Sequence, residues 1–476
     1  MNAFSGLKAN SRAATIVSTN ISNATTEGYA RRDLSLSSGL AGSHGGVRVD
    51  GVLRHVDPAV LADRRISDAQ LSYSEDMLGF ARRVEDAAGV SGAPGSLTSM
   101  VTAFENALVT AAANPSSTQR LETVAFTADA LADKLNQMSQ TIQSARQDAD
   151  KNIGMQVDRL NDSLQRIDAL NDDIIAASTT NTDVSSLLDE RQRLIDGISN
   201  IVPLRVVQRD MGAVSLFSTG GAMLLDGGAV TRIGFATTNA IDAGKTYAAG
   251  DLSGLTMNGI AINSGPGGLF AGGSLAAQFE IRDGVAVDEQ ARLDGLARDL
   301  AERLGPSGPD TTLSASDPGL FTDAGTLFDA TNEVGLAARI AVNTLVAPGS
   351  SEVWRLRDGL GSTAPGEAGN ARLLEAISQA LADPVIPGST AFASVARSFA
   401  DLAGDVSSGT AASRVRAENG QAFLSAQNTA LRERELTQGV DTDQELQRLM
   451  QIEQHYAANA RVMSVVDDLM ERLLAI

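Results

Sequence analysis

Residues 117–178 read STQRLETVAFTADALADKLNQMSQTIQSARQDADKNIGMQVDRLNDSLQRIDALNDDIIAAS, and this stretch decides the architecture of the chain. Its apolar residues recur at spacings of three and four, the seam of a helix that packs against other helices. Successive steps of four around Ile153 indicate a stutter that locally relaxes a supercoil. One helix over 117–178 is about 90 Å long, so we expect an elongated molecule. The seam positions are Leu121, Val124, Ala128, Leu131, Leu135, Met138, Ile142, Ala145, Ala149, Ile153, Val157, Leu160, Leu164, Ile167 and Ile174.

Helical periodicity continues on both sides of this stretch. Asp57 fits an N-cap, and Pro58 fits the first helical position, where its missing N–H costs nothing. Pro115 and Pro203 mark ends, because proline disfavours the helical conformation in the residue before it. The predicted helices cover 57–88, 95–112, 117–178, 184–198, 285–304, 371–382 and 390–437.

Residues 203–280 show a different pattern, with β-rich runs separated by glycine-containing turns. Turn signals at about eight-residue spacing indicate an antiparallel meander. Asn258-Gly259 lies between two alternating runs and is the strongest short hairpin signal in the chain. Two further strands are predicted near 47–52 and at 339–346.

Both ends of the chain carry narrow apolar seams that need neighbouring helices. We expect the two ends to pair at one end of a rod, with the β module at the far end; the alternative is that each end packs separately against the 117–178 helix. The first seam is Ala3, Leu7, Asn10, Ala14, Val17, Ile21 and Ala24. The second seam is Leu449, Ile452, Tyr456, Asn459, Met463, Val466, Met470 and Leu473.

Asn10 and Asn459 are the only polar members of these two seams. A buried asparagine lowers stability and fixes helix register or partner number. We therefore expect both residues at helix contacts in an assembled state; the alternative places each at a seam edge, facing solvent. Since few large side chains support the first seam, we also expect both ends to be largely unfolded before assembly.

The fold class that follows is α+β and mainly helical, an elongated rod of long helices with a β-rich module inserted in the middle. Residues 1–50 with 438–476 form the expected terminal coiled-coil domain. Residues 51–202 with 390–437 form the expected long-helix rod. Residues 203–389 form the expected β-rich module, with a helix near 285–304.

Composition excludes several classes of function. The 38 basic and 58 acidic residues give a formal net charge of −20, which argues against general nucleic-acid binding. No apolar run has the length of a membrane span, and the first 20 residues do not resemble a cleaved secretory signal. The chain has no cysteine and three histidines far apart, which predicts no disulfide, no thiolate chemistry and no metal site. We expect no cofactor.

Three candidate motifs for chemistry are weak. Gly244-Lys245-Thr246 ends like a phosphate-binding loop but lacks the first glycine, and a polar loop is the simpler interpretation. Ser5 and Lys8 have the spacing of a serine–lysine dyad without its companion segments. The adjacent acids Asp172 and Asp173 diverge on a helix. No nucleophile, base and oxyanion site come together, so we expect no enzyme.

Two terminal segments resemble the signature shared by the axial proteins of bacterial flagella. FSGLKA (residues 4–9) followed by NISNATTEGYARRDLSL (residues 20–36) resembles the N-terminal pattern, with Glu27 where proline is usual. GVDTDQELQRLMQIEQHYAANARV (residues 439–462) resembles the C-terminal partner. The matching N-terminal residues are Asn20, Ile21, Asn23, Thr26, Gly28, Tyr29 and Arg31.

Two segments in the interior of the chain narrow the choice among the flagellar axial proteins. NPSSTQRLETV (114–124) and LLDERQRLIDGIS (187–199) are similar to the flagellar hook-associated protein 1 family. The resemblance covers 1–60, 95–205 and 415–476, and it is weak over 205–395. It implies a structural protein that joins hook and filament by helical self-assembly, in contacts between copies that need not close.

The resemblance also implies partners and a location. These are further copies in a helical ring, the hook protein, the second hook-associated protein and an export chaperone on the C-terminal helix, with no nucleic acid and no membrane. The protein is then secreted to the extracellular flagellum by type III export without a cleaved signal peptide. Alternatives are another axial protein (the second hook-associated protein, a hook or a rod component), a coiled-coil surface adhesin or a stalked hydrolase. Neither the number of subunits per ring nor the role of the β-rich module follows from the sequence.

The expected assembly interface combines both seams with the N-terminal signature. Its residues are Leu7, Asn10, Ala14, Val17, Asn20, Ile21, Asn23, Gly28, Tyr29, Arg31, Leu449, Ile452, Tyr456, Asn459, Met463, Val466, Met470 and Leu473.

Overall fold

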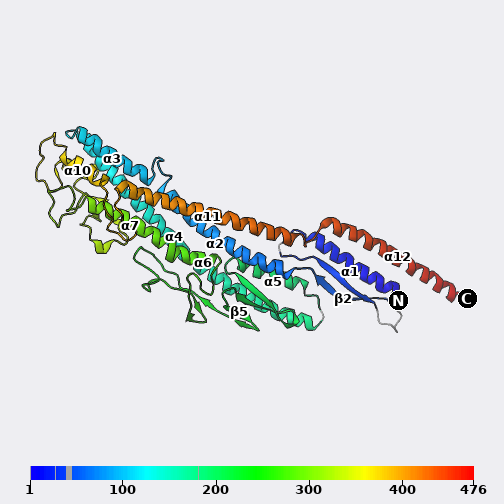
Figure 1. Ribbon diagram of the computed structural model, residues 1–476. Coiled ribbons are helices and arrows are strands. Elements are labelled where there is room, and N and C mark those ends of the chain that lie inside the picture. The colour runs from blue at the N-terminus through cyan, green and yellow to red at the C-terminus, as the bar shows by residue number, and fades with distance from the viewer. Residues whose placement is uncertain (1, 27, 39–45, 181, 476) are drawn as a thin grey trace.

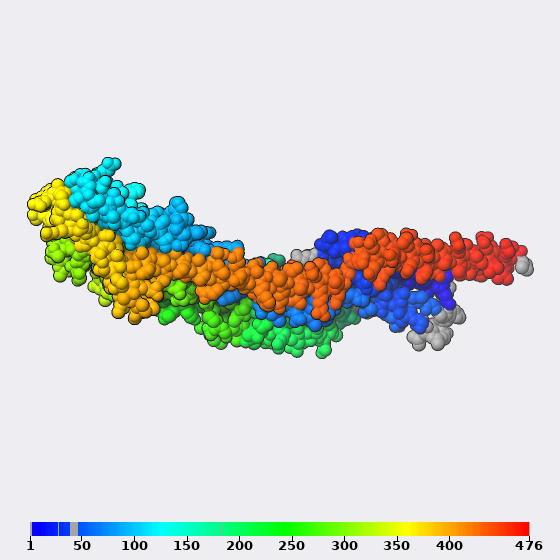
Figure 2. Space-filling model, turned by 45° about the horizontal axis from the view of Figure 1, so that its top comes forward, coloured from blue at the N-terminus to red at the C-terminus, as the bar shows by residue number. Residues whose placement is uncertain are grey.

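The computed structural model describes residues 2–26, 28–38, 46–180 and 182–475. The molecule is elongated, and both ends of the chain lie at the same end of it (Figures 1 and 2). The α-helices are α1 (Asn2–Ser22), α2 (Pro58–Ala88), α3 (Leu97–Ala113), α4 (Thr118–Thr179), α5 (Ser185–Ser199), α6 (Ser274–Glu280), α7 (Ala286–Arg303), α8 (Leu336–Arg339), α9 (Arg355–Asp358), α10 (Arg372–Ala382), α11 (Phe399–Leu436) and α12 (Thr442–Leu474). Shorter helical segments are η1 (Asp210–Gly212), the π-helical η2 (Ile281–Val285) and η3 (Ala330–Asn332).

The strands form small antiparallel sheets. They are β1 (Arg32–Ser38), β2 (Val47–Arg54), β3 (Leu204–Gln208), β4 (Val214–Ser218), β5 (Met223–Asp226), β6 (Ala229–Val230), β7 (Ile233–Gly234), β8 (Thr256–Met257), β9 (Ile260–Ala261), β10 (Phe321–Asp323) and β11 (Ile340–Val342). Neighbouring strands pair as β1-β2, β3-β4-β5-β6, β7-β8-β9 and β10-β11. The mainly helical α+β class is confirmed.

Helix α4 is the longest element, with 62 residues. The side chain of Ser117 caps its first turn by accepting a hydrogen bond from the Arg120 N–H. Every seam residue predicted between Leu121 and Ile174 is buried. The long helix therefore forms for the reason that its sequence indicates, a continuous apolar stripe covered by other elements.

Two hydrophobic cores lie one after the other along α4. The first core packs its N-terminal half against α2, α3, α7, α10 and the start of α11. The second core packs the C-terminal half of α4, from Ile153 to Ile167, against α5, α6 and the sheets that lie between them in the sequence, β3–β6 and β7–β9. One helix thus belongs to both cores.

The four-stranded sheet does not occupy the position that we expected. We expected the β module at the far end of the rod, but β3–β6 lie beside the C-terminal half of α4 (Figure 1). The far end consists of α3, α7, α10 and the segments around β10 and β11. The reason is that the seam of α4 continues to Ile174, so that its second half needs a cover, which β3–β6 and α5 provide.

Local signals explain one further agreement with the sequence and two differences. The predicted Asn258-Gly259 hairpin forms between β8 and β9, with φ of 48° and 83° at its two residues. Strand β1 was missed because its sequence is serine-rich, and β2 supplies its partner. Helix α11 begins at Phe399 rather than near 390, since Ser398 and Asp401 form a reciprocal capping box there.

A buried ion pair lies where the two cores meet on α4. The Arg282 Nη1 is 2.7 Å from the Asp150 Oδ1, and both side chains are fully buried. Arg282 also donates to the Ser253 carbonyl, and its own carbonyl accepts from Arg146 Nε at 2.8 Å. The other Asp150 oxygen accepts from the Thr238 N–H at 2.7 Å. The pair therefore connects α4, η2 and the loops beside the sheets.

Asp294 on α7 organises the turn before α8. Its carboxylate accepts hydrogen bonds from the N–H groups of Gly335 and Ala337 at 2.7 and 2.8 Å and from Gln290 Nε2 at 2.9 Å. Burial raises the pKa of Asp294 to about 6, and the two backbone N–H groups partly offset that effect.

We expect the far end of the rod to gain stability as the pH falls from 7 to 5. The pKa of Asp294 is higher in the folded chain than its ordinary value of 3.8, so the folded state binds more protons in this range. Relative to Asp294→Asn, the wild type should gain about 1 kcal/mol between pH 7 and pH 5, because a carboxyl with a pKa of about 6 takes up most of its proton in that range. Urea unfolding followed by the fluorescence of Trp354, the chain's one tryptophan, measures it. Equal pH dependence in both proteins would contradict this assignment.

Candidate functional site

The two end helices lie side by side, as the sequence predicted, and the structure shows that they run antiparallel (Figure 1). Asn20 of α1 contacts Glu445 near the start of α12, and Gly6 lies against Asn459. A Cβ at Gly6 would be 2.9 Å from Asn459 Nδ2, so the glycine allows close approach of the helices. The alternative, in which each end packs separately against α4, is wrong.

The α1 seam faces this contact. Val17 is buried, and Leu7, Asn10, Ala14 and Ile21 are half-buried. The Asn10 Nδ2 is shielded from solvent and has no hydrogen-bond partner among the described residues. Asn459 is half-buried against Gly6. The structure thus places Asn459 at the α1–α12 contact within one chain and leaves Asn10 half-buried on α1; the role of both asparagines in an assembled state stays a prediction.

The α12 seam is partly covered as far as Met463, except at Tyr456, and is exposed beyond Met463. Leu449, Ile452, Asn459 and Met463 are half-buried. Glu445 is the one residue of α12, Thr442–Leu474, that is fully buried. The seam positions left exposed are Tyr456, Val466, Met470 and Leu473.

We expect limited proteolysis to remove about the first 40 and the last 40 residues before it cuts α4. Both ends are helices that bury little, whereas α4 is buried along its length; that the ends are largely unfolded before assembly stays a prediction. Helices with few buried contacts open locally at low cost. Mass spectrometry of a protease time course measures the order of cleavage. Ends that survive as long as α4 would contradict the expectation.

Asn20 is the centre of a buried polar network between the ends of the chain. Its Nδ2 donates to the Glu445 Oε2 at 3.0 Å and to the Arg32 carbonyl at 2.9 Å. Its Oδ1 accepts from the Tyr29 hydroxyl at 2.7 Å and from the Arg32 N–H at 3.1 Å. Asn20 and Glu445 are both almost completely buried. One side chain thereby connects α1, β1 and α12.

Charged groups surround this network. Burial raises the pKa of the Tyr29 phenol, and the Arg32 guanidinium, 4.9 Å from the ring centre, acts in the opposite direction. Arg448 of α12 pairs with Asp33 of β1 at 2.6 Å. Asp33 also accepts from Arg31 at 2.9 Å. The start of α12 is therefore held to β1 by charge-assisted hydrogen bonds.

The remaining N-terminal signature residues shape the loop after α1. Asn23 donates to the Thr19 carbonyl at 2.9 Å and accepts from the Thr26 hydroxyl. Gly28 has a φ of 77°, and a Cβ there would lie 2.4 Å from the Arg193 Cγ on α5. Both the conformation and the space require glycine at this position.

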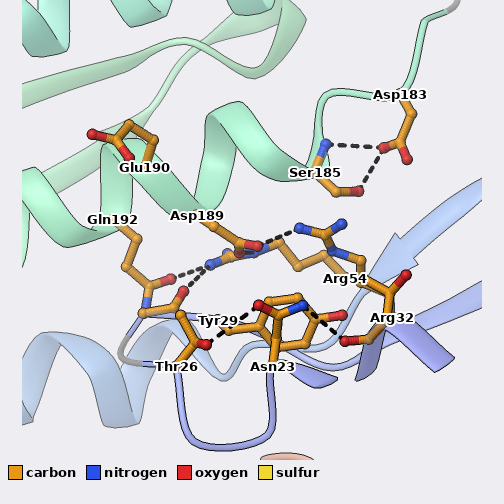
Figure 3. A network of polar contacts seen from close by, with 12 residues as sticks. Asn23, Thr26, Tyr29, Arg32, Arg54, Asp183, Ser185, Asp189, Glu190 and Gln192 are labelled. Carbon is orange, nitrogen blue, oxygen red and sulfur yellow. Dashed lines mark hydrogen bonds and ion pairs between the residues drawn. The ribbon is translucent and has the colours of Figure 1, made fainter. Parts of the chain in front are cut away.

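Asp189 on α5 joins the β1–β2 hairpin to the rod. Its carboxylate pairs with Arg32 and, at 2.7 Å, with Arg54. Arg54 also donates to the Gln192 side chain. Figure 3 shows these side chains converging between the hairpin and α5. The segment 187–199 thus supplies acceptors for arginines of the terminal unit, the name we give to α1, β1, β2 and α12 together.

A second ionic cluster lies on the rod side of this joint. Arg64 of α2 pairs with Asp68 at 2.6 Å, with Asp196 of α5 at 2.8 Å and with Glu435 of α11 at 2.6 Å. Nearby, burial together with Arg54 and Arg65 lowers the pKa of Arg191 to about 10. The ends of α2, α5 and α11 are therefore tied together beside the terminal unit.

The predicted site residues leave out several that the structure brings together here, namely Arg32, Asp33, Arg54, Asp189, Gln192, Glu445 and Arg448. Glu445 stands inside the C-terminal pattern, and Asp189 stands inside LLDERQR. Their positions were visible as motifs, but their roles depend on contacts with residues far away in the chain.

The weak chemical motifs are structural in the described residues. Lys245 donates to the Ala240 carbonyl at 2.7 Å within its own loop. Ser5 donates to the Asn2 carbonyl, while Lys8 is exposed. Within the described ranges, no group of three or more acidic or histidine side chains is placed to hold a metal ion. No described helix is long and apolar enough to cross a membrane.

Comparison with known families gives two matches at different parts of the chain. Residues 82–305 match the family described as flagellar hook-associated protein FlgK helical domain. Residues 437–476 match the family described as flagellar basal body rod FlgEFG protein C-terminal.

Curated relatives are similar over part or all of the chain. Flagellar hook-associated protein 1 of Salmonella typhimurium is 24% identical over 100% of this chain and 99% of its own length. The Escherichia coli protein of the same name is 25% identical over 52% of this chain and 46% of its own length. A solved structure of the flagellar hook junction protein FlgK from Burkholderia pseudomallei is 20% identical, with a TM-score of 0.46, over 56% of this chain and 47% of that chain.

Proposed function

We propose, from the premise that this chain belongs to the flagellar hook-associated protein 1 family, that it is a structural protein of the hook–filament junction of the bacterial flagellum. The observation that carries the proposal is the match of residues 82–305 to the helical domain of that family. The full-length similarity to a Salmonella relative supports it. The role is assembly rather than catalysis.

The proposed assembly unit is the terminal pair, residues 1–50 with 438–476, carried by the rod. Support comes from the α1–α12 contact and from the Asn20 network, which fixes that pair to β1. The proposed partners are further copies in a helical ring, the hook protein, the second hook-associated protein and an export chaperone that binds the C-terminal helix. The proposed route is type III export without a cleaved signal.

Electron microscopy of a deletion strain tests this function. Hooks should be present and filaments absent, with flagellin released into the medium, and the wild-type gene should restore filaments. Normal filaments in the deletion strain would refute the proposal and would favour an adhesin or a stalked hydrolase.

A second candidate is a hook or rod component, because residues 437–476 match a family named for basal-body rod proteins. The same micrographs separate the two candidates. Missing hooks in the deletion strain would support the second candidate and contradict the first.

A further inference from the structure

The end of α12 extends past the helix that covers its beginning. Asn20 lies at the level of Glu445 and Gly6 at the level of Asn459, so Asn2, where α1 begins, lies near Met463. Every described residue from Ser464 to Ala475 is exposed. Figures 1 and 2 show the C-terminal end of α12 projecting beyond α1. We call residues 464–474 the overhang.

The overhang is strongly apolar on one side. Its large apolar side chains occur in pairs four residues apart, which places them on one face of the helix. They are Val465, Val466, Leu469, Met470, Leu473 and Leu474, with exposed fractions from 47% to 85%. Val466 and Met470 continue the spacing of Asn459 and Met463, which face α1. The apolar surface is therefore the continuation of a helix–helix interface beyond the end of its own partner helix.

Acidic residues lie along one edge of this face. Asp467 and Glu471 are four residues apart, and Asp468 adjoins them. All three are exposed. None of them takes part in an ion pair with any residue in the ranges that the structure describes. A surface that is both apolar and basic would complement this apolar stripe and its unpaired acidic edge.

The outer face of α1 has that composition. Phe4, Lys8 and Arg12 follow each other at spacings of four, so they form one row on the helix. Phe4 is 61% exposed, and Lys8 and Arg12 are also exposed. This row lies away from α12, since the face that meets α12 contains Gly6 and Asn20. Neither cation has an ion-pair partner among the described residues.

We propose that the overhang of one copy docks on the outer face of α1 of a second copy, with its apolar stripe against Phe4 and its acidic edge against Lys8 and Arg12. The inference rests on the proposed function, since it identifies which surfaces of the terminal unit meet. The two surfaces are different, so the contact is heterologous and can repeat without closing. The occupant is a second copy because each copy carries one unsatisfied surface of each kind.

Crosslinking in assembled flagella tests the contact. The chain has no cysteine, so Phe4→Cys and Met470→Cys are unique thiols. Two differently tagged chains, each with one substitution, are expressed together in a deletion strain, and isolated hook–filament junctions are treated with a short bismaleimide. A product with both tags is expected. Val109→Cys on α3, which is 58% exposed, replaces Met470→Cys as the control and should give none.

Each other result overturns the proposal. A product that joins two Met470→Cys chains alone indicates a symmetric contact between overhangs. Junctions that contain both chains but yield no mixed product show that the surfaces do not meet, while the proposed function stands. Junctions that lack the chain altogether would remove both the inference and the proposed function.

Charge reversal supplies an independent readout. Lys8→Glu with Arg12→Glu, and separately Asp467→Lys with Glu471→Lys, should each lower the yield of mixed product about tenfold. Combining the two sets in one chain should restore most of the yield. Asp158→Lys with Asp162→Lys is the matched control, since these acids are exposed on α4 at the same spacing, and it should leave the yield unchanged. Loss without restoration contradicts the pairing of these charges.

Discussion

Replacing Arg282 by alanine should lower the free energy of unfolding by about 3–5 kcal/mol, the cost of leaving a buried charge without its partner. Asp150 would keep its position on α4 with no access to water, because both side chains of this pair are fully buried. The Ser253 carbonyl would also lose its donor. Thermal and urea unfolding of the purified chain measure the effect.

Two further variants make this result specific. Arg83→Ala removes an exposed pair with Asp148, 2.8 Å long, and should cost about 1 kcal/mol or less. Combining Arg282→Met with Asp150→Leu removes both charges of this pair and should recover part of the loss, since a buried pair replaced by apolar groups is often neutral. The recovery should be incomplete because Asp283 loses its pairing with Arg282 and the Thr238 N–H loses its acceptor. An Arg282→Ala protein as stable as the Arg83→Ala protein would show that water reaches Asp150.

Replacing Asn20 by alanine should weaken the hold of α1 and β1 on α12, leaving the Arg448–Asp33 pair in place, and should abolish filament attachment. Four partners lose a hydrogen bond at once, among them the buried Glu445 carboxylate and the Tyr29 hydroxyl. Leaving buried polar groups unsatisfied costs about 2–4 kcal/mol here. Hydrogen exchange should rise in the first turns of α12 and in β1 but not in α4, and cells with this variant should shed flagellin.

Asn23→Ala is the matched control for this prediction. It removes the same side chain three residues later, where the contacts are local, to Thr19 and Thr26. Its effect should be about 1 kcal/mol or less, with filaments still attached. Unchanged exchange in α12 for Asn20→Ala would show that the Asn20 network does not hold the ends together.

The fold could be predicted from sequence wherever a periodic signal extends over many residues. The α4 seam gave bounds within one residue of Thr118 and Thr179, since one face stays apolar throughout. Asn258-Gly259 predicted its hairpin through the left-handed backbone that both residues accept. These signals lie within continuous stretches of sequence, so they can be recognised without knowing which distant residues those stretches contact.

Other features depend on contacts that no local pattern records. Strand β1 has a serine-rich sequence, and its pairing with β2 defines it. Strands β3–β6 lie where they do because they cover the apolar stripe on the C-terminal half of α4. At the candidate site, the seams indicated that the ends would meet, but Asn20 and Glu445 are 425 residues apart. A polar pair at such a separation has no signature in a single sequence.

The sharing of α4 between two cores has a mechanical consequence. A load applied near the terminal unit passes along one continuous hydrogen-bonded backbone to the far end, without crossing an interface that could slip. The joint beside the terminal unit is built differently, from ion pairs around Asp189 and Arg64 and from two chain crossings near Asp57 and Gly439. We therefore expect bending of the molecule to concentrate at these two crossings rather than within α4.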